Sequence, residues 1–320
     1  MNVFLTFDIE VWCNGWERLD EVFPAAFDRY IYGRSKHGNY ALPKTLEILQ
    51  RHGLRGVFFV EPLFSARFGA RYLAEVVQLI EAARQDVQLH LHPEWTDEIS
   101  PPPLEHIPGK RQHLIQYSLD EQTALIRFGK ALLEAATGRP VQAFRAGSYA
   151  ANAHTFAALR RNGIRVDSSL NQVFAEVSGG GLSFPSAPQP WIPQAIDGVT
   201  TYPVTVFQDG RGRLRPAQVG ACSFAEMRDA LMDAQRCGCE HFVIVSHNFE
   251  MLKPDTSERD LVVMRRFERL CAFLAQNPDK FQVTGYPPAA LASAAAARRP
   301  RVSLGATVQR FAEQALRRVL

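Results

Sequence analysis

Histidine, carboxylate and arginine side chains follow several short apolar segments of this sequence. They are Asp8 and Glu10, then His90 and His92, Arg145, Asp167 and His247. Carboxylates and imidazoles are the groups that proteins use most for proton transfer and for holding divalent metals. Any one of these residues alone would suit an ordinary ion pair, but their common position predicts a catalytic centre.

The sequence letters VQLHLH at 87–92 alternate apolar and polar residues with period two. In a strand, His90 and His92 therefore point to the same side, about 7 Å apart along the chain. Such a pair suits two ligands of one zinc ion, and Glu10 or Asp8 supplies a carboxylate. We predict a metal site of Glu10, His90 and His92 with open positions, with zinc as the expected ion. Histidines that are merely hydrogen-bonded at a barrel rim are the alternative.

Asp8 and Glu10 place two carboxylates on one side of an extended segment. Metal sites use such a pair as one ligand and one base, and the spacing alone leaves open which residue has which role. His247 is the remaining titratable group suited to protonating a leaving amine. Arg145 keeps its charge and can hold a carboxylate in a fixed fork, so we predict that it orients Asp8.

Short apolar segments alternate with helical patterns along the chain, and these must position the polar residues. The predicted strands are 3–7, 56–60, 87–91, 141–144, 164–166, 201–207, 242–245 and 281–284. Capping boxes at Ser118 with Glu121 and at Ser223 with Glu226 predict two of the helix starts. The alternation predicts an α/β fold with parallel strands, in a barrel or a doubly wound sheet. In a barrel, the carboxyl ends of all strands share the face that carries the active site.

Two long connections, 10–42 and 171–199, interrupt this alternation. Loops of this length in a compact domain are usually functional or disordered. The first is rich in aromatic residues, which favours an ordered covering over the site, although aromatic packing alone would leave the same pattern.

The composition excludes several classes of protein. A formal net charge of +3 in 320 residues gives no reason to expect a nucleic-acid partner. The five cysteines are unevenly spaced and match no zinc knuckle. We find neither a signal sequence nor an apolar run of about 18 residues, so we expect a cytoplasmic protein. The expected domains are a catalytic barrel over 1–297 and a basic tail over 298–320.

At its polar residues the sequence resembles the polysaccharide deacetylase family, the NodB-like enzymes of carbohydrate esterase family 4. The resemblance covers residues 3 to about 285. The matching motifs are LTFD at 5–8, FRAGSY at 144–149, VDSS at 166–169 and VIVSH at 243–247.

The resemblance implies a distorted (β/α) barrel of seven or eight strands. It implies that Asp8 is the general base that activates water, that His247 is the general acid and that Arg145 tethers Asp8. It also implies that a backbone N–H near Ser148 or Tyr149 stabilises the oxyanion. The reaction would be removal of an N-acyl group, acetyl or formyl, from an amino sugar, with one divalent metal ion as cofactor.

The sequence departs from the family pattern in both metal motifs. The second of two adjacent aspartates is replaced by Ile9, and Glu10 fits the variant in which the acid comes two residues after the base. The two histidines are two residues apart instead of four, and Glu94 is an alternative ligand. Trp95 is a candidate substrate contact. These departures point to a divergent branch, which we associate with surface polysaccharide biosynthesis.

Two other functions fit parts of this pattern. An amidohydrolase-type barrel also binds metal through a His-x-His pair, but it carries the pair on its first strand. A catalytically silent barrel that binds a glycan would suit the aromatic loops. The presence of Asp8, Arg145 and His247 together argues against the silent barrel, because a binder needs neither base nor acid.

The C-terminal segment has its own pattern. Residues 307–320 have the pattern of an amphipathic helix. The apolar residues are Val308, Phe311, Leu316 and Val319, and the basic residues are Arg310, Arg317 and Arg318. A basic amphipathic helix can rest on an anionic membrane surface, here the inner face of the membrane. A final helix packed on the barrel is the alternative prediction.

Overall fold

The computed structural model describes residues 1–107, 109–177, 191–287 and 298–319. These residues form two compact units. The first unit comprises Met1–Val57, Thr205–Gly285 and the described residues from 298 onward. The second comprises the described residues of Phe58–Val204 with Tyr286 and Pro287.

The first unit is built on β1 (Asn2–Ile9), which pairs in parallel with β12 (His241–His247) and with β13 (Gln282–Val283). Seven of the eight residues of β1 are buried, as expected for a parallel strand covered on both faces. The β1–β12 register sets Asp8 directly opposite His247. The carboxyl ends of these two neighbouring strands therefore bring two of the predicted catalytic residues together.

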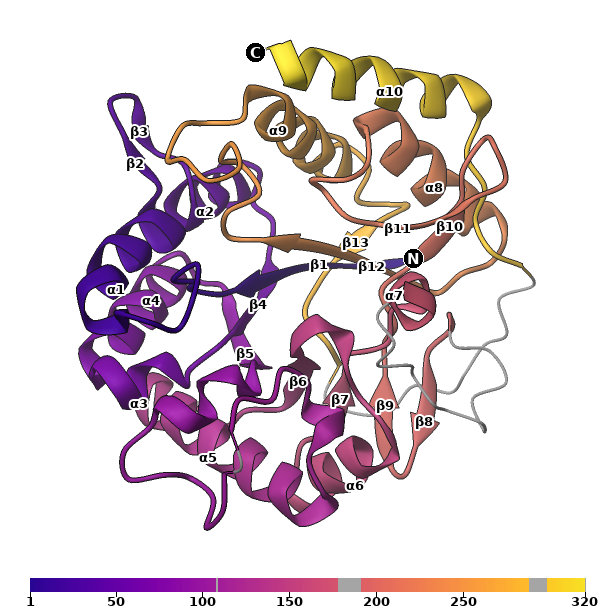
Figure 1. Cartoon of the computed structure of the whole chain (residues 1–320). Helices are drawn as coiled ribbons and strands as arrows, with labels where there is room; N and C mark the ends of the chain where they lie inside the picture. The colour runs from indigo at the N-terminus through magenta and orange to yellow at the C-terminus, as the bar shows by residue number, and fades with distance from the viewer. Residues whose placement is uncertain (108, 178–190, 288–297, 320) are drawn as a thin grey trace. The chain divides into compact units, whose positions relative to one another are not determined.

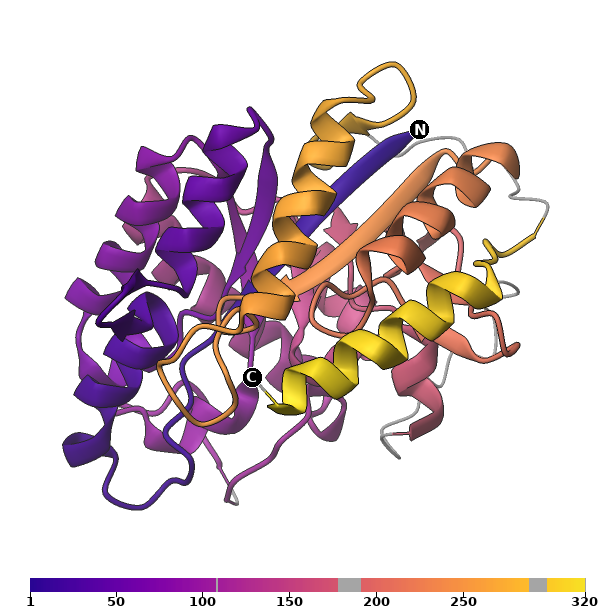
Figure 2. The same ribbon diagram turned by 90° about the horizontal axis from the view of Figure 1, so that it is seen from above.

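Helices and two small antiparallel ribbons complete the first unit (Figure 1). The ribbons are β2 (Arg34–Ser35) with β3 (Gly38–Asn39) and β10 (Val206–Gln208) with β11 (Leu214–Pro216). The helices are α1 (Leu19–Phe27), the π-helix η1 (Asp28–Tyr32), α2 (Leu42–Arg51), α8 (Phe224–Arg236), α9 (Leu261–Ala275) and α10 (Leu304–Val319). Figure 2 shows α10 running beside α8 and α9, which it contacts.

The second unit contains strands in the hydrogen-bonded order β4-β5-β6-β7-β9-β8. They are β4 (Gly56–Val60), β5 (Asp86–Leu91), β6 (Ala143–Ala146), β7 (Val166–Asp167), β9 (Val199–Thr201) and β8 (Gln194–Ile196). From β5 to β9 the pairing is parallel, and β8 joins antiparallel to β9. Crossover helices between parallel strands give this unit the predicted α/β pattern.

The helices of the second unit are mostly short, apart from α4 and α5. They are α3 (Phe64–Phe68), α4 (Ala70–Ala82), η2 (Pro93–Glu98), η3 (Leu114–Gln116), α5 (Leu119–Thr137), η4 (Gly147–Tyr149), α6 (Ala153–Arg161) and α7 (Gln172–Val177). Both predicted capping boxes are present. The Ser118 hydroxyl caps α5 by accepting from the Glu121 N–H, and Ser223 does the same for α8.

The predicted strand 201–207 is wrong, because the structure has two strands there. β9 ends at Thr201 and β10 begins at Val206. Pro203 lies between them, and a proline has no N–H to donate to a ladder. The chain therefore leaves one sheet and enters another at this point.

The long connection 10–42 is ordered and holds α1, η1 and the β2–β3 ribbon. No sequence signal marked α1, since Pro24 lies inside it and Arg18, at its N-cap, is in the left-handed region without a capping side chain. Aromatic contacts such as Phe23 on Phe27, with ring centroids 5.9 Å apart, hold the segment together. Much of the second long connection, 178–190, lies outside the described residues.

Within the described residues, no helix is both long and apolar enough to cross a membrane. The expected domain boundary lies between residues 297 and 298. Residues 288–297 are outside the described part of the chain. That boundary stays a prediction.

Candidate functional site

Asp8 and His247 end neighbouring parallel strands of the first unit. The Nε2 atom of His247 lies 3.9 Å from Oδ2 of Asp8. The Asp8 side chain is only 3% exposed and that of His247 is 19% exposed, so the histidine is the partner that solvent can reach. This pairing of a buried carboxylate with a reachable imidazole suits a base and an acid acting on one substrate.

Glu250 anchors His247 from the opposite side of the ring. Its Oε1 lies 3.0 Å from Nδ1 of His247. The carboxylate is fixed in turn by the side chains of Gln218 and Ser246, at 2.6 and 3.0 Å, and by the N–H of Gly220 at 2.6 Å. Since Nδ1 is held by Glu250, Nε2 is the nitrogen left to face Asp8.

This surrounding of acids holds the proton of His247. Burial alone would lower the pKa of His247, but the hydrogen bond to Glu250 and the charges of Glu10, Glu250 and Asp8 outweigh it and raise the pKa to about 9. The imidazolium is therefore the resting form at neutral pH. A histidine that keeps its proton can deliver it to a leaving group.

Glu10 lies beside this pair in the first unit and is also buried. The indole N–H of Trp12 donates to its Oε2 at 2.7 Å. Asn248 bonds the Glu10 backbone twice, by accepting from its N–H at 3.1 Å and donating to its carbonyl at 3.0 Å. Asp8, Glu10 and His247 each offer one ligand atom, and these atoms lie within 4.8 Å of one another. The first unit thus has a buried group of His, Glu and Asp that could hold a metal ion.

In the second unit, His90 and His92 lie at the carboxyl end of β5 with their rings 4.8 Å apart at 79°. The Nδ1 atom of His90 lies 2.8 Å from the carbonyl oxygen of Arg145. A carbonyl can only accept, so Nδ1 carries the hydrogen and Nε2 keeps its lone pair. Metal-binding histidines are usually oriented in this way by a second hydrogen bond.

His92 is oriented by a carboxylate and by a close glycine. Its Nδ1 lies 3.3 Å from Oε2 of Glu94, and both side chains are buried. A Cβ atom on Gly147 would meet the His92 ring at 2.6–2.8 Å, so no side chain fits there. Glu94 occupies the position of an orienting partner for the imidazole, which leaves Nε2 of His92 as the atom suited to a metal.

The turn after β6 contains the predicted oxyanion residues. Ser148 and Tyr149 have φ of 53° and 56°, so two consecutive side-chain-bearing residues are left-handed. Each such residue costs on the order of 1–3 kcal/mol, and such strain clusters at functional sites. The predicted role of this backbone in binding an oxyanion stays a prediction.

Arg145 is fully buried in the second unit. Its Nε donates to the Ser168 carbonyl at 3.1 Å, its Nη2 to the Ser168 hydroxyl at 2.9 Å, and its guanidinium lies 4.4 Å from the Phe59 ring centroid. Its predicted tether to Asp8 would join the two units and stays a prediction.

Asp167 ends β7 and is buried. Burial raises its pKa to about 6, against the opposing hydrogen bonds from Ser169 and Thr201 and the charge of Arg145. Its carboxylate accepts hydrogen bonds from the Ser169 N–H and hydroxyl and from the Thr201 hydroxyl. These bonds hold the ends of β7 and β9 together. Trp95 is likewise buried, with its ring edge-to-face against Phe68 at 6.1 Å, which is the packing of a supporting side chain.

Several residues of these clusters were not found from the sequence. Glu61 directly follows the predicted strand 56–60, so the strand-end rule could have found it. Burial raises its pKa to about 8, although N–H donors at Leu63 and Phe64 and the charge of His92 oppose this. Glu250 had a weaker signal, an acid three residues beyond the last strand-end histidine. Nothing in the sequence marked Trp12 as a donor to Glu10.

The chain matches no protein-family model and no curated protein sequence. Among solved structures, it is similar to a proposed polysaccharide deacetylase from Mycobacterium smegmatis, with a TM-score of 0.56 at 17% identity. The match covers 89% of this chain and 86% of that one. The fold is that of a NodB-like polysaccharide deacetylase. The predicted fold class, an α/β chain of the distorted (β/α) barrel type, is therefore confirmed.

Two further solved structures are also similar to this chain. One is a family 4 carbohydrate esterase from Streptomyces lividans in complex with acetate, at 14% identity and a TM-score of 0.46, covering 92% of this chain and 97% of that one. The other is a 4-alpha-glucanotransferase from Thermococcus litoralis, at 11% identity and a TM-score of 0.54, covering 89% of this chain and 39% of that one. Since the fold alone serves more than one reaction, the activity has to be argued from the side chains.

Proposed function

We propose that the protein is a metal-dependent hydrolase that removes an N-acetyl or N-formyl group from an amino sugar. The observation that carries this proposal is the line of Asp8, His247 and Glu250 in the first unit, with distances of 3.9 and 3.0 Å between consecutive partners. Amide hydrolysis needs one group that takes a proton from water and another that gives a proton to the amine. A protein that only binds a glycan needs neither.

Each of these residues has a defined step. Asp8 accepts the proton of the attacking water, and the carbonyl carbon becomes tetrahedral. His247 then donates the proton on Nε2 to the departing nitrogen as the carbon–nitrogen bond breaks. Glu250 holds Nδ1, so the ring keeps one orientation through both steps. The products are a carboxylic acid and a free amine.

Glu10, His90 and His92 are the residues proposed to hold the metal. Their donor atoms, a carboxylate oxygen and two imidazole nitrogens freed by hydrogen bonds on Nδ1, suit zinc. A bound divalent ion would polarise the acyl carbonyl and lower the pKa of water. Because this set draws on both units, it rests on the sequence pattern and on the orientation of each histidine within its own unit.

A rival ligand set lies within the first unit alone, namely Asp8, Glu10 and His247. Metal content separates the two sets. If Glu10, His90 and His92 bind the ion, His247→Ala keeps the metal and loses turnover, whereas His92→Ala loses both. If the rival set binds it, His247→Ala releases the metal and His92→Ala retains it. Plasma mass spectrometry of the purified variants reads this directly.

A carbohydrate substrate is supported by the fold relatives, which are named as a polysaccharide deacetylase and a glucanotransferase. We place the reaction in surface polysaccharide biosynthesis, in the cytoplasm or at the inner face of the membrane. This placement rests on the resemblance of the sequence to a divergent branch of the deacetylase family, to which the altered metal motifs point.

The deciding experiment measures acetate and formate released from a panel of N-acylated amino sugars, with added zinc and after chelation. Release that needs the metal and is absent in Asp8→Asn is the expected result. Tight glycan binding without release by metal-loaded protein would favour the silent glycan-binding barrel. Two adjacent metal ions per chain would favour the amidohydrolase-type alternative.

A further inference from the structure

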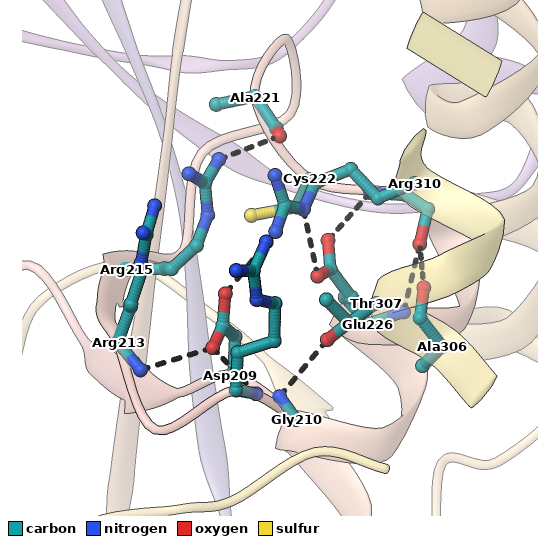
Figure 3. A network of polar contacts seen from close by, with 12 residues as sticks. Asp209, Gly210, Arg213, Arg215, Ala221, Cys222, Glu226, Ala306, Thr307 and Arg310 are labelled. Carbon is teal, nitrogen blue, oxygen red and sulfur yellow. Dashed lines mark hydrogen bonds and ion pairs between the residues drawn. The ribbon is translucent and has the colours of Figure 1, made fainter. Parts of the chain in front are cut away.

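The C-terminal helix α10 turns three of its four charged side chains toward the first unit. Arg310 is 4% exposed and donates to Glu226 at 2.8 Å and to Asp209 at 3.1 Å (Figure 3). Arg266 on α9 meets Glu313 at 2.6 Å, and Arg317 pairs with Asp260, the N-cap of α9. Ion pairs and hydrogen bonds therefore attach this helix to the first unit.

Hydrogen bonds to small polar residues strengthen the same inner face. The Gly210 N–H donates to the hydroxyl of Thr307 at 2.9 Å, and the Ser223 hydroxyl donates to the carbonyl of Ala306 at 3.2 Å (Figure 3). Thr307 and Ala306 are buried. The polar stripe of an amphipathic helix, which normally faces water, is thus used here for attachment.

The outer face of α10 is apolar. Among the described residues, five large hydrophobic side chains are exposed, and all but Phe174 lie on this helix. They are Leu304, Val308, Phe311 and Leu316, exposed by 59, 57, 42 and 47%. Leu304, Val308 and Phe311, spaced by four and three residues, lie along one side of the helix, and Leu316 lies at the edge of that side. A strip of this kind on an otherwise polar surface marks an interaction site.

Positive charge borders this strip. The Arg211 guanidinium lies 5.9 Å from the Phe311 ring centroid, and both Arg211 and Arg318 are exposed. The only acidic residue of α10, Glu313, is already paired with Arg266. The exposed face is therefore apolar in the middle and cationic at its margins.

A basic cavity of about 570 Å³ lies at the C-terminal end of α10, where Arg317 forms part of its wall. Its ionisable lining is five cations, one histidine and two acids: Arg34, Lys36, Lys253, Arg259, Arg317, His37, Glu258 and Asp260. Three of these cations are in ion pairs, Arg34 with Asp28, Lys253 with Glu258 and Arg317 with Asp260. Lys36 and Arg259 give the lining its net positive charge, which suits an anion such as a phosphate group. The cavity and the apolar strip share one helix.

We infer that the first unit docks on the surface of an anionic phospholipid bilayer, with the outer face of α10 in the interface and a headgroup phosphate in the basic cavity. An apolar helix face with basic margins is the pattern of helices that lie in a membrane interface. A second copy of this chain is a poorer occupant, because it would bring arginine margins against arginine margins. Nothing in this inference depends on the proposed hydrolysis.

The test is cosedimentation of the full-length protein with vesicles of phosphatidylcholine alone and of phosphatidylcholine with phosphatidylglycerol. We expect binding to the anionic vesicles only. Val308→Gln combined with Phe311→Gln removes the apolar contact without changing charge and should weaken partitioning by about tenfold or more. Phe174→Gln, which changes an exposed aromatic residue of the second unit, is the matched control and should bind as the wild type does.

The cavity is tested separately by Lys36→Gln combined with Lys253→Gln, which should weaken binding to anionic vesicles by about tenfold. Circular dichroism and thermal melting confirm that each variant is folded. The inference is overturned if the wild type ignores anionic vesicles, or if the α10 variant binds them as tightly as the wild type. Dimers in light scattering that dissociate in the α10 variant, without vesicle binding, would assign the face to a second copy instead. Equal binding to both kinds of vesicle would also overturn the inference, because phosphatidylcholine carries no net negative charge.

Discussion

Two strand-end histidines, His247 in the first unit and His90 in the second, differ in the charge of the group that holds Nδ1. His247 places Nδ1 on the carboxylate of Glu250 at 3.0 Å, and further acids raise its pKa to about 9. His90 places Nδ1 on the backbone carbonyl of Arg145 at 2.8 Å. The carboxylate favours a charged ring that can give up a proton, whereas the neutral carbonyl fixes a ring whose other nitrogen can bind a metal.

The difference shows that residue type and strand-end position do not assign a histidine's role. The partner of Nδ1 does, and it comes from a turn or a neighbouring strand. If this contrast is correct, variants around His247 should change proton transfer and variants around His90 and His92 should change metal binding.

Asp8→Asn should reduce turnover by about 10³-fold, because an amide cannot accept the proton of water. Metal content should not change if Asp8 is a base and not a ligand. Steady-state kinetics with mass-spectrometric metal analysis measure both. Asp255→Asn, at an exposed position, is the matched control and should behave as the wild type. Loss of metal in Asp8→Asn would move Asp8 into the ligand set.

His92→Ala should lose the metal and, with it, activity by about 100-fold or more. His154→Ala, an exposed histidine of the same unit, should keep both. Full metal occupancy in His92→Ala would show that the contrast between the two histidine environments has been misread.

Gly147→Ala should weaken metal affinity by about 10–100-fold, the usual effect of disturbing a ligand's orientation. The new methyl group would meet the His92 ring at under 3 Å, so the ring must move. Competition with a chelator measures the affinity. Gly305→Ala meets nothing closer than 4.0 Å and serves as the control. An unchanged affinity would mean that His92 is not a ligand or that its position is unimportant.

Glu250→Gln should shift the alkaline limb of the pH–rate profile downward by about one unit. His247 must be protonated to act, so wild-type turnover should fall as the pH rises through about 9. Without the Glu250 charge, burial and the remaining acids set the pKa of His247, and the proton is lost at lower pH. Turnover should then drop by about twofold near pH 8 and by close to tenfold near pH 10, while turnover near pH 6 changes little.

Glu258→Gln removes a neighbouring exposed acid and should leave the profile in place. Stability should follow the same direction. The folded-state pKa of His247 lies above its ordinary value, so its contribution is complete below about 6.5 and is lost as the pH rises through about 9. An alkaline limb that stays fixed in Glu250→Gln would exclude His247 as the acid.

The sequence predicted what depends on local pattern. Strand 56–60 matches β4 at both ends, and the capping boxes of α5 and α8 lie where Ser118 and Ser223 indicated. The likeness of the fold to a polysaccharide deacetylase was also readable, because its motifs sit at strand ends.

The contacts that assign roles were not readable, since they depend on tertiary structure. The Glu250 carboxylate reaches His247 only through the turn after β12, and the His90 partner is a backbone atom of another strand. Helix α1 was missed for a local reason, because Pro24 and a left-handed Arg18 remove the usual signals. The two faces of α10 could be seen as a pattern, but which of them faces inward could not.

The inward charge of α10 has a genetic consequence. A stop codon after Pro300 would remove the arginine partners of Asp209, Glu226 and Asp260 and would expose the surface of α8 and α9 against which α10 packs. Hydrogen bonds to charged groups contribute about 1.5–3 kcal/mol each, so the loss of several of them removes a large part of the stability of a whole domain. Such an allele should therefore yield an unstable, degraded chain, and selection should preserve the residues of α10 that pair with the first unit as strictly as the catalytic motifs.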